Sequence, residues 1–131
     1  EEYDIIVVDR SQASFFAYQL NNGNVRTLLE PAYEETLKAD FYKNCNFTTI
    51  YLHCDSQIAI ERMKHSRGTL DAIESHGPDY QDTVKKYYDE CFALYESLRP
   101  GIKIDTSLND QVTCSKIAFD FVMKQLELRT K

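Results

Sequence analysis

Three short runs of apolar, mostly β-branched residues divide the chain. They cover residues 5–8 (IIVV), 48–55 (TTIYLHCD) and 102–105 (IKID), and charged or turn-forming residues bound each of them. Continuous runs without strict apolar–polar alternation are typical of parallel strands that are covered on both faces. The pattern therefore predicts three strands of one parallel sheet, the first of them close to the first residue.

Apolar residues at helical spacing predict two helices between the first two strands. Residues 14–20 fit a short helix that an Asn- and Gly-rich turn stops. A second helix is expected to begin at Pro31, because proline suits the first turn of a helix. It would place Tyr33, Leu37 and Phe41 on one buried face.

Three further helices are predicted in the second half of the chain. Asp55 or Ser56 can cap a helix that runs through residues 58–63. A long helix follows Pro78, and a Pro-Gly pair ends it. Its apolar positions are Tyr80, Val84, Tyr87, Tyr88, Cys91, Leu94, Tyr95 and Leu98. The last helix is expected to begin at about Asp110. Its expected buried residues are Val112, Cys114, Ile117, Phe121 and Val122.

Strands that alternate with helices indicate an α/β fold, with a parallel sheet flanked by helices. The 131 residues are enough for one such domain, spanning residues 1–131. Ligands of parallel sheets bind beyond the carboxyl ends of the strands. Asp9 and Arg10 directly follow the first predicted strand, so we expect them to face that ligand crevice.

The composition narrows the class of protein. Charged residues make up 27% and apolar residues 43%, which is typical of a soluble globular domain. No apolar run approaches the ~20 residues that a membrane span needs, and no secretory segment is present, so we expect no membrane association. The net charge is −6 with scattered basic residues, which argues against a nucleic acid polymer as partner.

The cysteines point to a reducing compartment. Four are present, at 45, 54, 91 and 114, and none forms a Cys-x-x-Cys pair, so no zinc site is predicted. Cys91 and Cys114 fall on apolar stripes and are interpreted as buried thiols. This usage is typical of a cytoplasmic protein.

Asp9 and Arg10 are the first candidate site residues. A guanidinium at a strand end can hold a phosphate or carboxylate through two parallel hydrogen bonds. Asp9 could orient that guanidinium, hold a magnesium-bound water or accept a proton. The alternative is a plain ion pair that closes the edge of the sheet.

Residues about 62–78 are the second candidate region. They carry Arg62 at the end of a predicted helix, and Arg67-Gly68 before a new helix that Thr69 could cap. Cations on a connection between two helices suit a lid that closes over a transferring phosphate. The alternative is a solvated connection without a site.

Taken together, these blocks resemble the C-terminal two thirds of a thymidylate kinase. That family carries a strand ending in Asp-Arg, then a Ser and an Ala-Tyr-Gln, here Asp9-Arg10, Ser14 and Ala17-Tyr18-Gln19. Bacterial lids of the family often read R-G-x-L-D-R-I-E. The matching residues here are Arg67, Gly68, Leu70, Asp71, Ile73 and Glu74. The resemblance covers nearly the whole chain and implies a P-loop kinase-like fold.

The resemblance implies ATP-dependent phosphorylation of a deoxynucleoside monophosphate, most simply dTMP to dTDP, with Mg²⁺. Asp9 and Arg67 would be the catalytic residues, with Asp9 near magnesium through water and Arg67 at the transferring phosphoryl group. Arg10 would hold the acceptor phosphate. Ser14, Tyr18, Gln19 and Glu74 would line the acceptor pocket, and Arg62 would lie near the donor adenine. A homodimer is a candidate assembly.

Three departures from the family pattern keep alternatives open. Ser11 replaces the family's Tyr or His and is similar to the Glu-Arg-Ser motif of deoxynucleoside kinases. Ala72 replaces a lid arginine, and Arg26 comes later than the family's arginine after Gln19. The alternatives are a deoxynucleoside kinase and a non-catalytic module that binds a nucleotide or a partner.

The largest departure is the absence of a Gly-x-x-x-x-Gly-Lys-Ser/Thr loop, which cradles the donor phosphates in this family. The chain also opens on Glu1 and a strand pattern. We therefore expect a C-terminal part that lacks the central strand, is inactive alone, and needs the N-terminal segment to complete the fold. With that strand missing, we expect no stable isolated monomer, because two strand edges would be unpaired.

Overall fold

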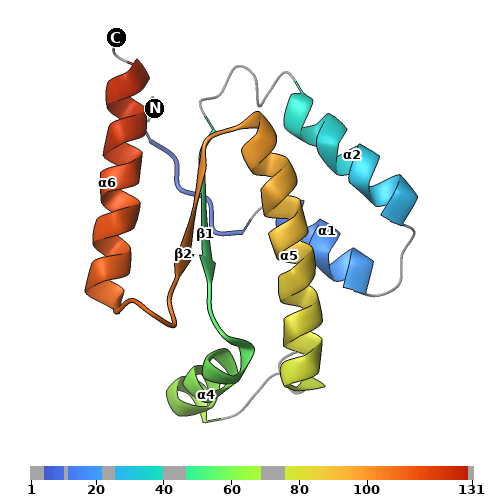
Figure 1. The fold of residues 1–131 in the computed structure, drawn as a ribbon, viewed down its shortest axis with the longest axis vertical. Helices are drawn as coiled ribbons and strands as arrows, with labels where there is room; N and C mark the ends of the chain where they lie inside the picture. The colour runs from blue at the N-terminus through green and yellow to red at the C-terminus, as the bar shows by residue number, and fades with distance from the viewer. Residues whose placement is uncertain (1–4, 11, 22–25, 40–46, 69–75, 130–131) are drawn as a thin grey trace.

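The computed structural model describes residues 5–10, 12–21, 26–39, 47–68 and 76–129, and it shows a mixed α/β architecture (Figure 1). Two helices precede the first strand of the described residues, two more separate it from the second strand, and a last helix follows. In chain order they are α1 (Gln12–Asn21), α2 (Arg26–Lys38), β1 (Thr49–His53), α4 (Ser56–Arg67), α5 (Pro78–Leu98), β2 (Gly101–Asp105) and α6 (Gln111–Arg129).

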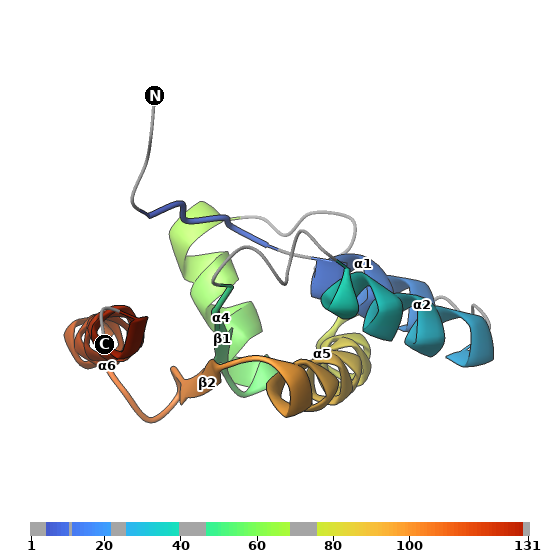
Figure 2. The same cartoon turned by 90° about the horizontal axis from the view of Figure 1, so that it is seen from above.

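The sheet of the described residues has two parallel strands. β1 pairs with β2 in a register that runs from Thr49 opposite Gly101 to His53 opposite Asp105. Helices α4 and α5 connect the two strands, and α5 and α6 lie on opposite sides of them (Figure 2). This arrangement confirms the strands predicted at 48–55 and 102–105, and it confirms a parallel sheet flanked by helices.

The hydrophobic core joins three helices to one strand. Phe16 of α1 lies 4.7 Å from Tyr33 of α2, measured between ring centroids, and both side chains are buried. Phe92 of α5 lies 5.4 Å from Tyr51 of β1 in the same measure. Helix α5 is therefore the central element, with α1 and α2 packed against it and the sheet on its other flank (Figure 1).

The predicted N-terminal cap of α4 is present, and the structure adds a cap at the other end. The Asp55 carboxylate accepts hydrogen bonds from the backbone N–H groups of Gln57 and Ile58, at 3.0 and 3.2 Å. At the other end, Gly68 adopts a left-handed conformation with φ of 75°, and its N–H donates to the Lys64 carbonyl at 2.9 Å. Both devices satisfy backbone groups that a helix end leaves open.

Helix α2 begins earlier than predicted. It starts at Arg26 and carries Pro31 in its interior, where proline removes one backbone hydrogen bond. Tyr33 and Leu37 are buried as expected, and their packing offsets that loss. Phe41, the third residue of the predicted face, lies outside the described residues.

The strand predicted at residues 5–8 is wrong. Ile5, Ile6, Val7 and Val8 belong to no strand or helix, and between 53% and 89% of each is exposed. β-branched residues favour a strand only where a neighbouring strand supplies hydrogen bonds and packing. The segment is not part of the two-stranded sheet, and Figure 2 shows it apart from β1 and β2, so the described fold gives it no such neighbour.

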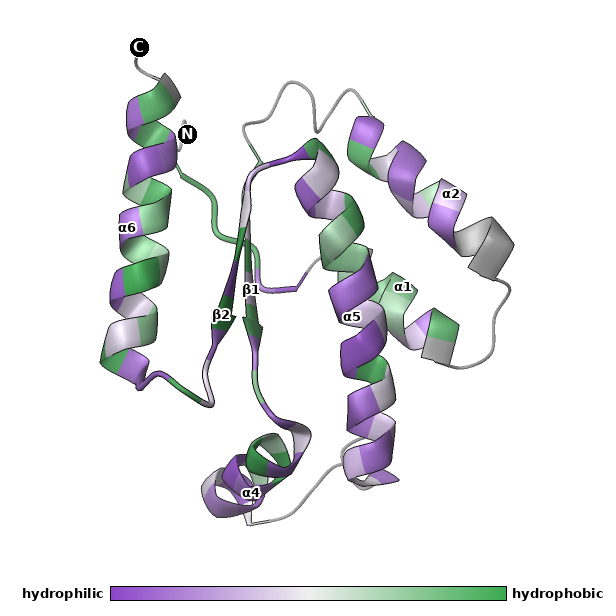
Figure 3. Ribbon diagram, in the orientation of Figure 1, coloured by the Kyte–Doolittle hydropathy of each residue, from purple (hydrophilic) through white to green (hydrophobic). Residues whose placement is uncertain are grey.

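The apolar residues of helix α6 are interspersed with polar ones and do not gather on one stripe (Figure 3). Cys114 is buried as predicted, and Ile117, Phe121 and Val122 are half-buried. Val112 was expected in the core but is 78% exposed, and Phe119 is 63% exposed. The helix packs on β2 along one side only, so its other apolar side chains stay open to solvent.

Gly101 stands where α5 passes closest to the sheet. A Cβ at this position would lie 2.9 Å from Cε2 of Phe92 and 3.3 Å from Cε1 of Tyr95, both buried rings of the core. We expect Gly101→Ala to destabilise the fold by about 1–3 kcal/mol, because packed rings must shift to admit the methyl group. Urea denaturation checks this result. A variant as stable as the parent would show that the two rings yield freely.

Candidate functional site

Asp9 and Arg10 form an exposed turn between residues 5–8 and α1. Arg10 has φ of 68°, in the left-handed region that non-glycine residues seldom adopt. The described residues show no ion pair between the two side chains. An arginine held in a costly backbone conformation, at the entry to a helix, is the kind of strained residue that occurs often at binding sites.

Helix α1 presents the next three candidates. Ser14 and Tyr18 are four residues apart, on the same face of the helix, and Gln19 follows; all three are half-buried. The Tyr18 ring meets Tyr88 of α5 edge to face, with 6.2 Å between centroids. Tyr88 in turn stacks on Tyr51 of β1 at 6.0 Å. This row of tyrosines links the candidate acceptor helix to the sheet.

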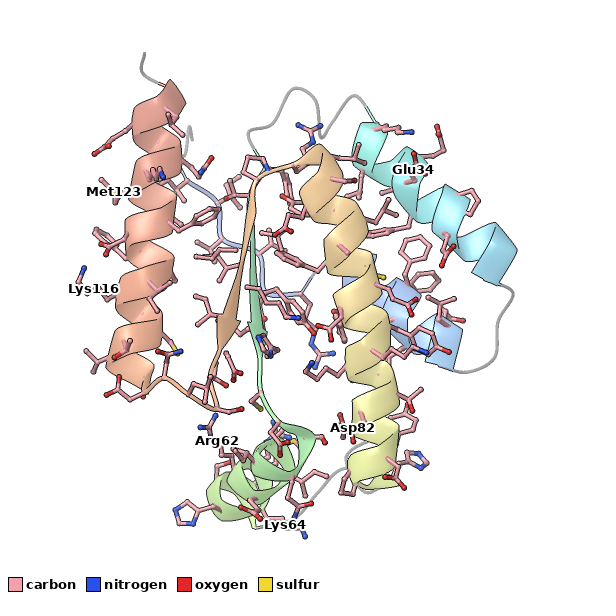
Figure 4. All side chains as sticks on the ribbon, viewed as in Figure 1. Glu34, Arg62, Lys64, Asp82, Lys116 and Met123 are labelled. Carbon is pink, nitrogen blue, oxygen red and sulfur yellow. The ribbon has the colours of Figure 1, made fainter. Side chains whose placement is uncertain are left out.

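Arg62 lies in the middle of α4 rather than at its end. Its guanidinium donates from Nη2 to the Thr106 carbonyl at 2.9 Å and from Nη1 to the Thr106 hydroxyl at 3.2 Å. The Thr106 N–H donates to the His53 carbonyl at 2.8 Å. Arg62 is therefore fixed at the carboxyl ends of β1 and β2, the usual ligand edge of a parallel sheet (Figure 4).

The segment after β2 is held by its own hydrogen bonds. The Ser107 N–H donates to the Asp105 carboxylate at 2.8 Å, and the Ser107 hydroxyl accepts from the Asp55 N–H at 2.7 Å. The bond from Ser107 lowers the pKa of Asp105 below its usual range. Asn109 donates to the Asp105 carbonyl at 2.8 Å. These bonds tie the ends of both strands to the start of α4.

The remaining lid candidates are described only in part. Arg67 is the last residue of α4 and is exposed. Residues 69–75 of the predicted lid, which include Ala72 and Glu74, lie outside the described residues. The described candidates thus fall into two groups, one on and before α1 and one on α4, and these two helices lie apart in Figures 1 and 2.

A charged cluster beneath the tyrosine row was not predicted from the sequence. Asp89 of α5 accepts hydrogen bonds from Lys103 of β2 at 2.7 Å and from Lys85 at 2.9 Å. Burial alone would raise the pKa of Asp89, but these two bonds outweigh it and the net pKa is lowered. Lys103 also lies 5.4 Å from the centre of the Tyr51 ring. Burial raises the pKa of Tyr51, and Asp89 adds to that rise.

We expect Lys103→Met to raise the pKa of Asp89 toward its ordinary value, because one of its two donors is lost. A lowered carboxylate pKa stabilises the fold above the unfolded pKa of about 3.9, and that stability is lost as the pH falls through the folded pKa. The variant should therefore lose up to about 1 kcal/mol at pH 7, since the pair is partly exposed. The deficit should shrink toward pH 3.

Carboxyl-carbon NMR titration of Asp89 and urea unfolding at both pH values measure these effects. Lys116→Met is the matched control, because Lys116 pairs with Asp120 on the exposed side of α6. An unchanged Asp89 titration in Lys103→Met would show that Lys85 alone holds the carboxylate.

A cavity of about 550 Å³ lies between α1, α2 and α5, and none of the candidate residues lines it. Its apolar lining includes Phe16, Leu20, Tyr33 and Leu94. Glu30, Glu34 and Glu90 add carboxylates to its lining. Within the described ranges, no group of three or more His, Cys, Asp or Glu could hold a metal ion. No helix among the described residues is long and apolar enough to cross a membrane.

Comparisons with known proteins found no matching family model, no matching curated protein and no matching solved structure.

Proposed function

We propose that the chain is the acceptor-binding part of a cytoplasmic nucleotide kinase that transfers a phosphoryl group from ATP and Mg²⁺ to dTMP. The observation that carries this proposal is the ordered series of an Asp9-Arg10 turn, a helix bearing Ser14, Tyr18 and Gln19, and an Arg67-Gly68 lid start. The fold proposed with it is P-loop kinase-like, completed by a central strand and phosphate loop.

Arg10 holds the acceptor phosphate in this proposal. Its side chain is exposed, and its left-handed backbone lies at the entry to α1. Two parallel hydrogen bonds from a guanidinium match a phosphate better than a single ammonium does. Asp9, next to it, orients the acceptor and the water shell of magnesium.

The nucleoside of the acceptor lies against α1. Ser14 and Tyr18 share one face of the helix, and the contact of Tyr18 with Tyr88 restricts the Tyr18 ring. A restricted aromatic ring beside hydroxyl and amide groups suits a base that needs both stacking and hydrogen bonds. Gln19 completes this pocket, and the family resemblance adds Glu74 as the contribution of the lid.

Arg62 and Arg67 are the residues of this chain that we assign to the donor nucleotide and the transferred phosphoryl group. The double hydrogen bond from Arg62 to Thr106 places a planar cation beside the carboxyl ends of the strands, where it can stack on the donor adenine. Arg67, one turn later on α4, supplies charge to the transferring phosphoryl group. Phosphoryl transfer depends chiefly on such positioning and charge.

Nucleotide binding to the isolated chain tests the acceptor half of the proposal. In NMR titrations, dTMP should shift the backbone amides of Arg10, Ser14 and Gln19. Thymidine should shift them less, because it lacks the phosphate that Arg10 holds. Equal shifts by thymidine would favour the deoxynucleoside kinase that Ser11 suggests. No shift by any deoxynucleotide would favour a non-catalytic module that binds a partner and would overturn the proposal.

Turnover tests the catalytic half of the proposal, the transfer of the phosphoryl group. A longer protein, in which a strand and a Gly-x-x-x-x-Gly-Lys-Ser/Thr loop precede this chain, should convert dTMP to dTDP with ATP and Mg²⁺. Chromatography of the nucleotides measures this conversion. The 131 residues alone should not catalyse it. A complete, folded protein that binds dTMP but forms no dTDP would restrict the chain to nucleotide binding.

A further inference from the structure

The cavity between α1, α2 and α5 is built from one face of each helix. Helix α1 contributes Phe16 and Leu20, four residues apart, and α5 contributes Cys91 and Leu94, three residues apart. Each of the three helices contacts the other two, and Figures 1 and 2 show α1 and α2 together on one flank of α5. The volume of about 550 Å³ lies in the range of pockets that hold a small organic molecule.

Two aromatic rings form part of the apolar wall of this cavity. The side chains of Phe16 and Tyr33 are buried, and their rings lie 4.7 Å apart between centroids, tilted by 50°. Because the face of an aromatic ring carries partial negative charge, it attracts a cation as well as apolar groups. Leu20, Pro31 and Leu94 extend the apolar surface. The wall therefore suits an apolar body that carries a positive group.

The charged groups of the cavity all have one sign. Glu30 and Glu34 lie one turn apart on α2, and Glu90 adds a carboxylate from α5, whereas the described lining contains no Lys, Arg or His. The Oε2 atom of Glu90 is buried. A carboxylate attracts a cation more strongly where water is excluded. Lys38 forms an ion pair with Glu34 from outside the described lining. The cavity therefore favours a cation over an anion.

We propose that this cavity binds a small organic cation, an ammonium group carried on an apolar body. The body packs against Phe16 and Tyr33, and the ammonium lies beside the carboxylate of Glu90. Ser14 and Tyr18 precede Phe16 and Leu20 by two residues each, so they lie on nearly the opposite side of α1 and do not line the cavity. The cation site is thus separate from the acceptor site and does not rest on the proposed function.

Titration of the 131-residue chain with 2-phenylethylamine tests the proposal, because this compound joins a phenyl ring to an ammonium group. We expect saturable binding with a Kd below about 1 mM. Filtered NOEs should join the phenyl ring to the methyl groups of Leu20 and Leu94. The neutral 2-phenylethanol should bind at least ~10-fold more weakly, and the anionic 3-phenylpropionate should not bind, because both lack the cation. Saturating dTMP should leave the Kd of the amine unchanged.

Glu90→Gln should weaken the amine at least ~10-fold and leave phenylethanol binding unchanged, because it removes the charge and keeps the shape. Glu35→Gln is the matched control, since Glu35 is exposed on α2 and does not line the cavity. Lys38→Met should strengthen amine binding by about 2–5-fold, because Glu34 loses its own cation. The NOEs on the parent chain do not depend on how any variant folds.

Equal binding of the amine and the alcohol would overturn the proposal, because it would show an apolar cavity without selection for charge. So would NOEs from Tyr18 or Tyr88, displacement of the amine by dTMP, or no saturable binding up to about 10 mM. Loss of the amine as the chain self-associates, followed by sedimentation velocity, would show that a second copy covers the cavity instead. None of these outcomes except displacement by dTMP bears on the acceptor site.

Discussion

Arg10→Ala is expected to weaken dTMP binding by about 100-fold, since two charge-assisted hydrogen bonds are each worth roughly 1.5–3 kcal/mol and part of that energy is recovered by solvent. Arg10→Lys should recover little of the loss, because an ammonium cannot reproduce the paired donors of a guanidinium. Isothermal titration with dTMP measures both variants. In the completed kinase the same change should lower kcat/KM by a similar factor.

Arg10→Gly separates binding from folding. It should lose dTMP binding to the same extent as Arg10→Ala. It should also raise the free energy of unfolding by up to about 1 kcal/mol, because glycine adopts φ of 68° without the cost that arginine bears. Full dTMP affinity in Arg10→Ala would remove Arg10 from the phosphate site. A Gly variant less stable than the parent would show that the guanidinium supports the fold.

Ile104→Ala should lower the free energy of unfolding by about 2–5 kcal/mol, the usual range for emptying a buried aliphatic site. Ile104 is 2% exposed, the most completely buried large side chain of the described residues, and it lies on β2 opposite Leu52 in the sheet register. Urea denaturation gives the value. Leu108→Ala, only three residues past β2 but exposed, should change stability by less than about 0.5 kcal/mol. Equal losses in both variants would show that burial of Ile104 is not what stabilises β2.

Elements with their own local signals were predicted well. The Asp55 cap, the Pro78 start of α5 and the Pro-Gly end of that helix appear where the pattern placed them. The two strands that pair with each other were also predicted, because each has a neighbour within the chain. Local chemistry decides such features, so a single sequence reveals them.

Features that depend on a distant partner were not predicted. Residues 5–8 have the composition of a buried strand, yet composition cannot supply the neighbouring strand that makes one. The same holds for Val112, whose apolar side chain has no facing element. The Asp89–Lys103 pair joins α5 to β2, and the Tyr18–Tyr88 contact joins α1 to α5. No spacing within one helix or strand indicates either contact.

The register of the sheet also bears on how the chain reaches its fold. Every backbone bond between β1 and β2 joins residues about fifty positions apart, as the pairing of Thr49 with Gly101 shows. Closing so long a loop is entropically unfavourable until the intervening helices are in place. A ribosome would release all of α4 and α5 before β1 could meet β2. During synthesis, β1 therefore waits for its partner strand β2 until both of these helices have been made.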